Sequence, residues 1–238
     1  MKFDKNFWKN WISDWRAYVA EFTATFIFIL ISAMVVVVNY LYGQIGALGV
    51  SVVIGLTYAA LIFATSHLSG GYLNPAITFS LWLGSKMKGT RTVFLILAQL
   101  AASFAAYASV LLLFGQNAVK INLGAPTLGL GETIAQATVL EAILSAVLIF
   151  CVYAVMVDRR GPVSFGPLVL GLILTAITIV SMPLSGAALN PSRVIGAYAI
   201  LKSFNFLIPW ILGPLVGSFA GLLYELVFLA AETEKINS

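Results

Sequence analysis

Apolar residues follow one another in six long runs, and polar or charged residues gather in the short segments between them. The runs lie at about 17–40, 47–67, 91–114, 133–157, 165–183 and 206–230. Each is long enough for a helix that crosses the roughly 30 Å hydrocarbon layer of a bilayer. The runs are continuous rather than alternating, which argues against the strands of a membrane β-barrel. The pattern predicts an all-α membrane protein with six transmembrane helices.

Two further apolar stretches, about 75–84 and 191–201, are too short to cross a bilayer. At 1.5 Å per residue each gives a helix of roughly 15–17 Å, which is half of the hydrocarbon thickness. Each follows an Asn-Pro pair, at Asn74 and at Asn190. We therefore expect two re-entrant half-helices in addition to the six spans.

The two halves of the chain resemble each other. The segment "LSGGYLNP" at 68–75 matches "LSGAALNP" at 184–191, and Glu21 and Glu141 occupy matching places in the first span of each half. Three spans per half is an odd number, so the second half must enter the membrane from the opposite side. We expect one domain at 17–231 with an inverted-topology repeat, at about 17–114 and 133–231. Matching broken helices in such repeats indicate a site near the bilayer midplane.

Composition and charge agree with this topology and orient it. Of the residues, 61% are hydrophobic and 9% are charged, and the mean hydropathy is +1.00. Basic residues mark the cytoplasmic side of a membrane protein. The side that holds both termini carries most of them, namely Lys2, Lys5, Lys9, Arg16, Lys86, Lys88, Arg91, Arg159, Arg160 and Lys235. We expect a multi-pass protein of a plasma or bacterial inner membrane, with a cytoplasmic N-terminal segment (1–16) and tail (232–238) and no nucleic-acid partner.

The letters of the repeated segment suit the start of a half-helix. Glycine and small residues let the backbone stay extended, which is tolerated at membrane depth where it lines a watery cavity. Asparagine suits an N-cap, and proline suits the first helical turn because its missing N–H would have no partner there. An inverted repeat brings the two N-termini together, so two positive dipole ends and the amides of Asn74 and Asn190 face one spot. Such a site attracts a neutral oxygen and repels cations.

The chain resembles the aquaporin (major intrinsic protein) family over essentially its whole length. The resemblance rests on "SGGYLNPAIT" at 69–78, "SGAALNPSRV" at 185–194 and the repeated membrane glutamates. It implies a homotetramer with one pore per subunit, a passive channel rather than an enzyme, and no cofactor or metal. Single-file passage would use backbone carbonyls along the path, namely those of Gly70, Gly71, Tyr72, Leu73, Gly186, Ala187, Ala188 and Leu189. The copies differ from the family pattern at Tyr72, where histidine is common, and at Ser192, where alanine is usual.

In this family a constriction of four residues selects solutes. Matching its positions by their spacing from each asparagine implies that the constriction consists of Ile54, Thr178, Ala187 and Arg193 in this chain. At two of the four positions strict water channels have an aromatic residue and a histidine, and the residues of this chain are smaller. The resemblance therefore implies passage of water and small uncharged solutes such as glycerol, urea or hydrogen peroxide. The glycerol subgroup usually has aspartate directly after the arginine, where this chain has Val194, so a strict water channel remains the alternative.

Several residues can be interpreted either as structural or as functional. Glu21 and Glu141 are expected to hold the interrupted loops by accepting backbone N–H groups, and a proton relay in an ion-coupled transporter is the rival interpretation. His67 is expected to pack at a loop entrance rather than to act as a pH gate. The segment 157–162 is interpreted as a topology signal. Trp8, Trp11 and Trp15 favour an interfacial anchor over partner binding. A junctional membrane protein with a vestigial pore is the last alternative.

Overall fold

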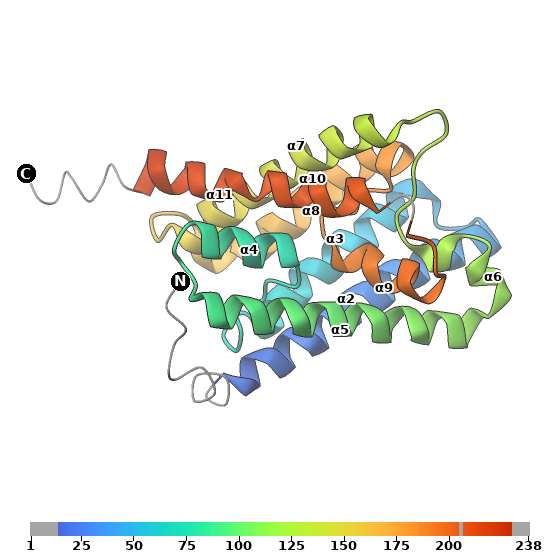
Figure 1. Ribbon diagram of the computed structural model, residues 1–238, viewed down its shortest axis with the longest axis horizontal. Helices are drawn as coiled ribbons and strands as arrows, with labels where there is room; N and C mark the ends of the chain where they lie inside the picture. Colours follow the sequence, from blue (N-terminus) through green and yellow to red (C-terminus); the bar gives the residue numbers. More distant parts are fainter. Residues whose placement is uncertain (1–13, 205–206, 230–238) are drawn as a thin grey trace, which may run out of the picture.

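The computed structural model describes residues 14–204 and 207–229 and places them in one bundle of helices (Figure 1). Among the residues that the structure describes, six helical segments are long and apolar enough to cross a membrane. They are Trp15–Tyr42, Gly46–Thr65, Gly89–Phe114, Ile134–Val157, Val163–Ser185 and Ile208–Leu229. Each observed end lies within two residues of the predicted one. The all-α fold with six spans is confirmed.

The spans are divided into elements as follows. The first three are α2 (Trp15–Tyr42), α3 (Gly46–Thr65) and α5 (Gly89–Phe114). The short α6 (Gln116–Val119) and η1 (Asn122–Gly124) connect the two halves. The fourth span is α7 (Ile134–Val152) followed by the π-helical η2 (Tyr153–Val157). The fifth is η3 (Val163–Phe165) with α8 (Gly166–Ser185), and the sixth is α10 (Ile208–Gly217), α11 (Phe219–Tyr224) and η4 (Glu225–Leu229).

The two predicted half-helices are present as α4 (Pro75–Leu83) and α9 (Ser192–Ile200). Figure 1 shows α4 at the end of the bundle where the described chain begins and ends, and α9 toward the opposite end. Their N-terminal ends both face the middle of the molecule. The re-entrant segments therefore enter from opposite faces, as the inverted repeat requires.

The packing partners of the helices follow the same symmetry. Helix α2 packs along α5 as α7 packs along α10, and α9 lies on α5 as α4 lies on α10 and α11. The equivalent helices α3 and α8 pack on each other, and their contact is close at Gly55 and Gly171. A Cβ atom on Gly55 would lie 2.4 Å from the Gly171 carbonyl oxygen, and one on Gly171 would lie 2.6 Å from the Gly55 oxygen. Small residues at this crossing let the two backbones approach.

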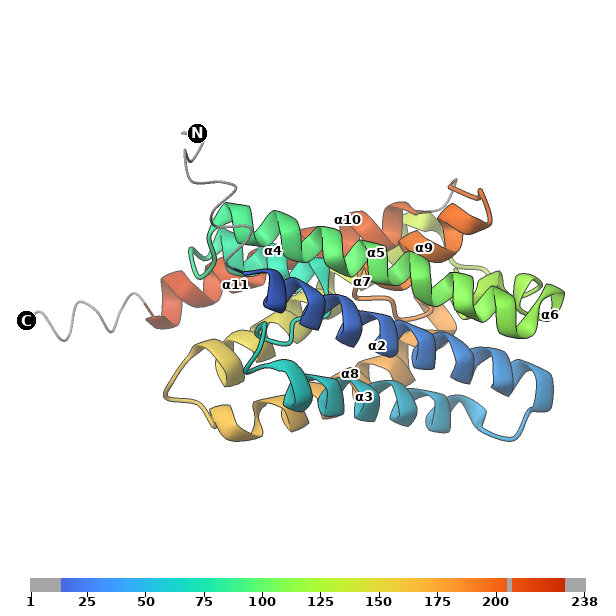
Figure 2. The same cartoon turned by 90° about the horizontal axis from the view of Figure 1, so that it is seen from below.

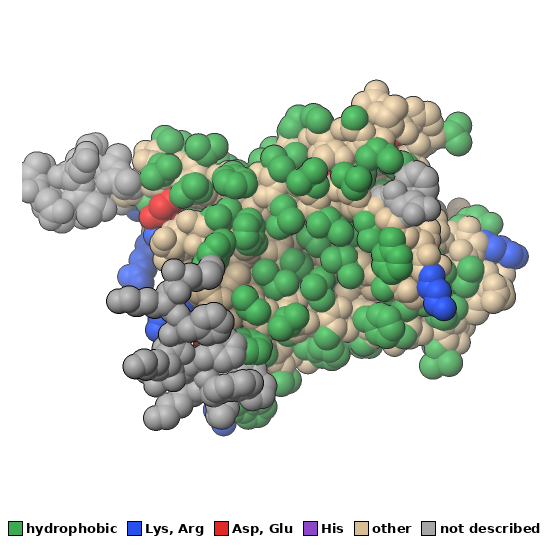
Figure 3. All heavy atoms as spheres, in the orientation of Figure 1, with side chains coloured by type: hydrophobic (Ala, Val, Ile, Leu, Met, Phe, Trp, Pro, Cys, Tyr) green, Lys and Arg blue, Asp and Glu red, His purple; other side chains and the backbone are tan. Residues whose placement is uncertain are grey.

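The outer surface is apolar around the middle and charged at the ends. Figure 3 shows hydrophobic side chains across the face, with Lys and Arg side chains at its two ends, and Figure 2 shows the spans running along the long axis. Leu112, Leu172 and Leu223 are more than half exposed, as lipid contact allows. Trp15 is 53% exposed beside Arg16, whereas Trp8 and Trp11 of the predicted anchor lie outside the described residues.

Candidate functional site

The two repeated asparagines cap the half-helices at the centre of the bundle. The Asn74 side-chain oxygen accepts a hydrogen bond from the Ala76 amide at 2.9 Å, and Pro75 opens α4. The Asn190 oxygen accepts from the Ser192 amide at 2.9 Å in the same way. Each asparagine thus supplies an acceptor to one of the backbone amides that the first helical turn leaves without a partner. Because the oxygens face their own helices, the two side-chain amide nitrogens face away from them.

Those amide nitrogens join the two halves of the chain. Asn74 Nδ2 donates to the Leu189 carbonyl at 2.9 Å, and Asn190 Nδ2 donates to the Leu73 carbonyl at 2.8 Å. From the sequence, both carbonyls and both amides were expected to bind the permeating solute. In the structure one hydrogen of each amide is used between the loops, so one hydrogen of each remains to donate elsewhere. This contact links residues more than a hundred positions apart and was not predicted.

Leu73 and Leu189 hold equivalent, unusual backbone conformations. Their φ angles are 54° and 55°, in the left-handed region that side chains with a Cβ seldom adopt. Each amide is fixed by a glutamate, because Leu73 N donates to Glu21 at 2.9 Å and Leu189 N donates to Glu141 at 2.6 Å. The glutamates therefore hold the turn that delivers each asparagine to the centre.

Glu21 is fully buried and accepts four hydrogen bonds. One carboxylate oxygen accepts from Ser69 Oγ and the Tyr72 amide, both at 2.8 Å, and the other accepts from the Leu73 amide and Gln99 Nε2. All four partners are donors, the set that an acceptor-only carboxylate requires. Gln99 was missed by sequence reasoning, although an amide inside an apolar span was a visible signal.

Glu141 makes the matching contacts in the second half. Its oxygens accept from Ser185 Oγ at 2.6 Å, from the Ala188 amide at 3.0 Å and from the Leu189 amide. The loop contacts of the two glutamates are thus equivalent, whereas Glu141 has no counterpart of Gln99 within the described parts of the chain. Both carboxylates contact loop donors of the kind that a supporting role needs.

Three cavities lie in series along the interior. A large cavity of about 510 Å³ opens at the α4 end and is lined by His67, Gly70, Gly71, Tyr72 and neighbouring residues. A central cavity of about 10 Å³ is lined by Phe28, Tyr58, Asn74, Leu148, Leu174, Ala188, Leu189, Asn190 and Arg193. An outer cavity of about 100 Å³ is lined by Val36, Gly124, Ala125, Pro126, Thr127, Met182, Gly186 and Arg193. Tyr58 lines the first two and Arg193 lines the last two, so the three cavities follow one another along the bundle.

Arg193 lies at the junction of the central and outer cavities. It is 3% exposed, and its Nη1 donates to the Ala187 carbonyl, with the Ala188 carbonyl at 3.5 Å. The hydroxyl of Tyr107 in α5 donates to the Arg193 backbone carbonyl. The guanidinium is thereby held against the second re-entrant loop, with its charge at the path.

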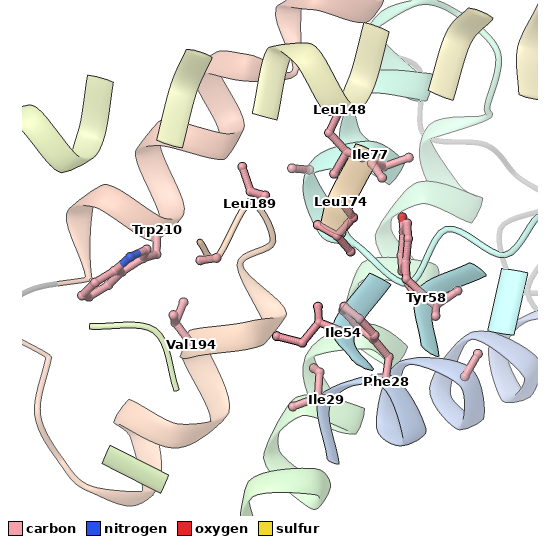
Figure 4. Close-up of a cluster of buried hydrophobic side chains, with 14 of the residues drawn as sticks. Phe28, Ile29, Ile54, Tyr58, Ile77, Leu148, Leu174, Leu189, Val194 and Trp210 are labelled. Carbon is pink, nitrogen blue, oxygen red and sulfur yellow. The ribbon is translucent and has the colours of Figure 1, made fainter. Parts of the chain in front are cut away.

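The other three residues of the predicted constriction are buried but line none of these three cavities. Ile54 stands four residues before Tyr58 in α3, and Thr178 stands four residues after Leu174 in α8. Each is therefore one turn from a lining residue, on the same helix face and toward the outer cavity. Figure 4 shows Ile54, Tyr58 and Leu174 pointing into the same interior space.

The loop 157–162 contains a clasp that the sequence analysis did not foresee. Asp158 is 5% exposed and accepts from Arg160 Nε at 2.9 Å, from Arg160 Nη2 at 2.6 Å and from the Tyr224 hydroxyl at 3.0 Å. The Arg160 guanidinium also donates to the Phe228 carbonyl. Hydrogen bonds from Arg160 hold the pKa of Asp158 well below its usual range. The clasp ties this loop, which borders the large cavity at Val157, to the end of the sixth span.

Comparisons with known proteins agree with this architecture. A family model described as "Major intrinsic protein" matches residues 8–224. The "Lens fiber major intrinsic protein" of Ovis aries is 34% identical over 231 residues, which are 94% of this chain and 87% of that protein. "Probable aquaporin TIP4-1" of Oryza sativa subsp. japonica is 37% identical over 230 residues, which are 92% of this chain and 90% of that protein. A solved aquaglyceroporin from Plasmodium falciparum has a TM-score of 0.77 at 22% identity, covering 92% of this chain and 98% of that one, and shows the fold.

Proposed function

The chain belongs to the major intrinsic protein family, and on this basis we propose that it forms a passive channel for water and small uncharged solutes that excludes ions and protons. The observation that carries the proposal is the series of three cavities, which passes both asparagine caps and ends beside Arg193. Family members named as aquaporins and an aquaglyceroporin of the same fold support it.

The central cavity suits a single water. A volume of about 10 Å³ is about that of one water-sized probe, so molecules would pass this point one at a time. The remaining amide hydrogens of Asn74 and Asn190 would donate to the oxygen of that molecule. The N-terminal ends of α4 and α9 both face the centre, and their positive dipole ends would oppose a cation and a chain of protons.

Backbone carbonyls along the path would accept the hydrogens of passing molecules. Five of the eight predicted carbonyls already accept a hydrogen bond from a side chain, namely those of Tyr72, Leu73, Ala187, Ala188 and Leu189. Each carbonyl oxygen has a second lone pair, so these groups would still receive a permeating donor. Gly70, Gly71 and Gly186 would serve at the mouths of the path, because all three line the large or the outer cavity.

Charge selectivity would rest on Arg193. Its buried guanidinium places a fixed positive charge at the path, which would repel cations while its donors hold neutral oxygens. Ile54, Thr178 and Ala187 carry no charge and are smaller than an aromatic side chain, which supports passage of glycerol, urea or hydrogen peroxide. The small central cavity favours the second candidate, a strict water channel.

We propose that the protein assembles as a homotetramer in the bilayer, with one path per subunit and both termini in the cytoplasm. The apolar outer faces of the spans would meet lipid or neighbouring subunits, and the basic residues at the α4 end would lie on the cytoplasmic side. The mass of the detergent-solubilised protein, corrected for bound detergent, would test the tetramer, and a monomeric mass would contradict it.

Stopped-flow light scattering on proteoliposomes tests the function. Vesicles with the protein should shrink faster than empty vesicles in a sucrose gradient, and should re-swell faster in glycerol, urea or hydrogen peroxide. Water flux without flux of any of these solutes would favour the strict water channel. Permeability equal to that of empty vesicles for every solute would contradict the proposal.

A further inference from the structure

We propose that Tyr58 sets the size limit for uncharged solutes, at a constriction separate from the four residues around Arg193. The inference rests on the proposed channel function and adds a specificity-determining residue on the α4 side of the centre. Tyr58 lies in α3, is 2% exposed and lines both the large and the central cavity. Its side chain therefore lies between these two cavities.

The ring is confined from several sides. Phe28 of α2 packs against it with ring centroids 5.2 Å apart, and Leu174 of α8 lines the same central cavity. Ile77 of α4 lines the large cavity beside it. Figure 4 shows the Tyr58 side chain pointing into the interior among these residues. Phe28 and Leu174 therefore limit how far the ring can move toward the central cavity.

The Tyr58 hydroxyl donates a hydrogen bond to a backbone carbonyl of the first re-entrant loop. It donates to the Tyr72 carbonyl at 3.2 Å, one of the carbonyls expected to accept hydrogen bonds from permeating molecules. A polyol crossing this point would meet apolar groups of Phe28, Leu148 and Leu174, and one of the two lone pairs of the Tyr72 carbonyl oxygen is already used. Hydrogen bonds lost without replacement oppose the passage of a solute with several hydroxyls more than that of water.

The free volume along the path falls sharply across Tyr58. The cavity on one side of the ring holds about 510 Å³ and the cavity on the other about 10 Å³. Glycerol has three carbons and three hydroxyl oxygens, so it needs several times the space of one water. The side chain of Tyr58 is larger than those of Ile54, Thr178 and Ala187, the three uncharged residues of the predicted constriction. Shortening Tyr58 should therefore widen the path more than shortening any of these three.

The test compares the ratio of glycerol to water permeability among variants in proteoliposomes. Tyr58→Leu should raise the ratio about tenfold, the scale on which one or two carbon groups discriminate between solutes in a pocket. Tyr58→Phe should raise the ratio much less than Tyr58→Leu, because it frees the Tyr72 carbonyl but keeps the ring. Ile54→Ala should raise the ratio clearly less than Tyr58→Leu does, because it removes less side-chain volume. If Tyr58→Leu does not fold, Tyr58→Met tests the same point with a flexible side chain.

A matched control separates the pore from general packing. Tyr153 is also a buried tyrosine whose hydroxyl donates to a backbone carbonyl, that of Ser80 at 2.8 Å, but it lines none of the three cavities. Tyr153→Phe should leave both permeabilities unchanged. An unchanged ratio in the Tyr58→Leu variant, or an equal rise in Ile54→Ala, would overturn the inference while leaving the channel proposal intact. Absence of water permeability in the unmodified protein would instead defeat the channel proposal.

Discussion

Replacing Glu21 by glutamine tests how the re-entrant loop is held. Glutamine keeps one acceptor oxygen and puts an NH₂ group in place of the other. If the NH₂ group takes the position beside Leu73, that backbone amide loses its acceptor, and if it takes the other position, the Tyr72 amide does. Ser69 and Gln99 can turn to present an acceptor, so the best arrangement leaves one buried N–H without a partner.

The magnitude follows from these contacts. One unsatisfied buried donor costs about 1–3 kcal/mol, and the hydrogen bonds that remain are weakened because they no longer reach a charged acceptor. We expect Glu21→Gln to lower the free energy of unfolding by about 2–4 kcal/mol in total. Glu141→Gln should lower the free energy of unfolding by a similar amount, because it leaves the backbone amide of Leu189 or of Ala188 without an acceptor. The matched control is Glu225→Gln, where the partly exposed pair with Lys86 predicts a loss of about 1 kcal/mol or less.

Thermal unfolding in detergent, followed by tryptophan fluorescence, should order the variants with Glu225→Gln near the unmodified protein and both buried variants well below it. Water permeability of reconstituted protein should fall with the loss of loop order. The rival interpretation, a proton relay, predicts unchanged stability and lost proton-coupled transport. Equal unfolding temperatures for Glu21→Gln and Glu225→Gln would refute the supporting role.

Three other substitutions probe separate parts of the account. Arg193→Val should let protons or cations cross, as read by a pH-sensitive dye inside proteoliposomes, and unchanged exclusion would remove the role given to this charge. Ser192→Ala should leave stability equal or raise it by up to about 1 kcal/mol, because the buried Ser192 hydroxyl has no hydrogen-bond partner within the described structure, and a clear fall in unfolding temperature would contradict this. Asp158→Asn should lower stability by about 1 kcal/mol at neutral pH. Because the folded pKa of Asp158 is depressed below the unfolded value of about 3.9, its contribution is complete at neutral pH and is lost only in more acidic solution, so the two proteins should converge in unfolding temperature there and a constant difference would count against the clasp.

The features that the sequence predicted well are those that neighbouring residues determine. The spans follow from runs of apolar residues, and the half-helices follow from Asn-Pro beside a stretch too short to cross the bilayer. The capping bonds of Asn74 and Asn190 reach only two residues along the chain. The repeat itself then indicated that the second half enters from the opposite face.

The features that were not predicted from the sequence depend on contacts between distant segments. Asn74 meets Leu189 across 115 positions, and Gln99 meets Glu21 across 78. The local sequence pattern does not determine which distant carbonyl a side chain contacts. The carbonyls of Leu73 and Leu189 were therefore predicted to contact only the solute. Tyr58 lies in a uniformly apolar helix, where an aromatic residue first suggests packing, and only the bundle places it between two cavities.

Water and proton permeability measured on the same proteoliposomes decide whether the protein conducts water while it excludes protons. We predict osmotic shrinkage that rises in proportion to the amount of protein, while an imposed pH gradient decays no faster than in empty vesicles. Proton flux that rises together with water flux, or water flux that does not rise with protein, would contradict it.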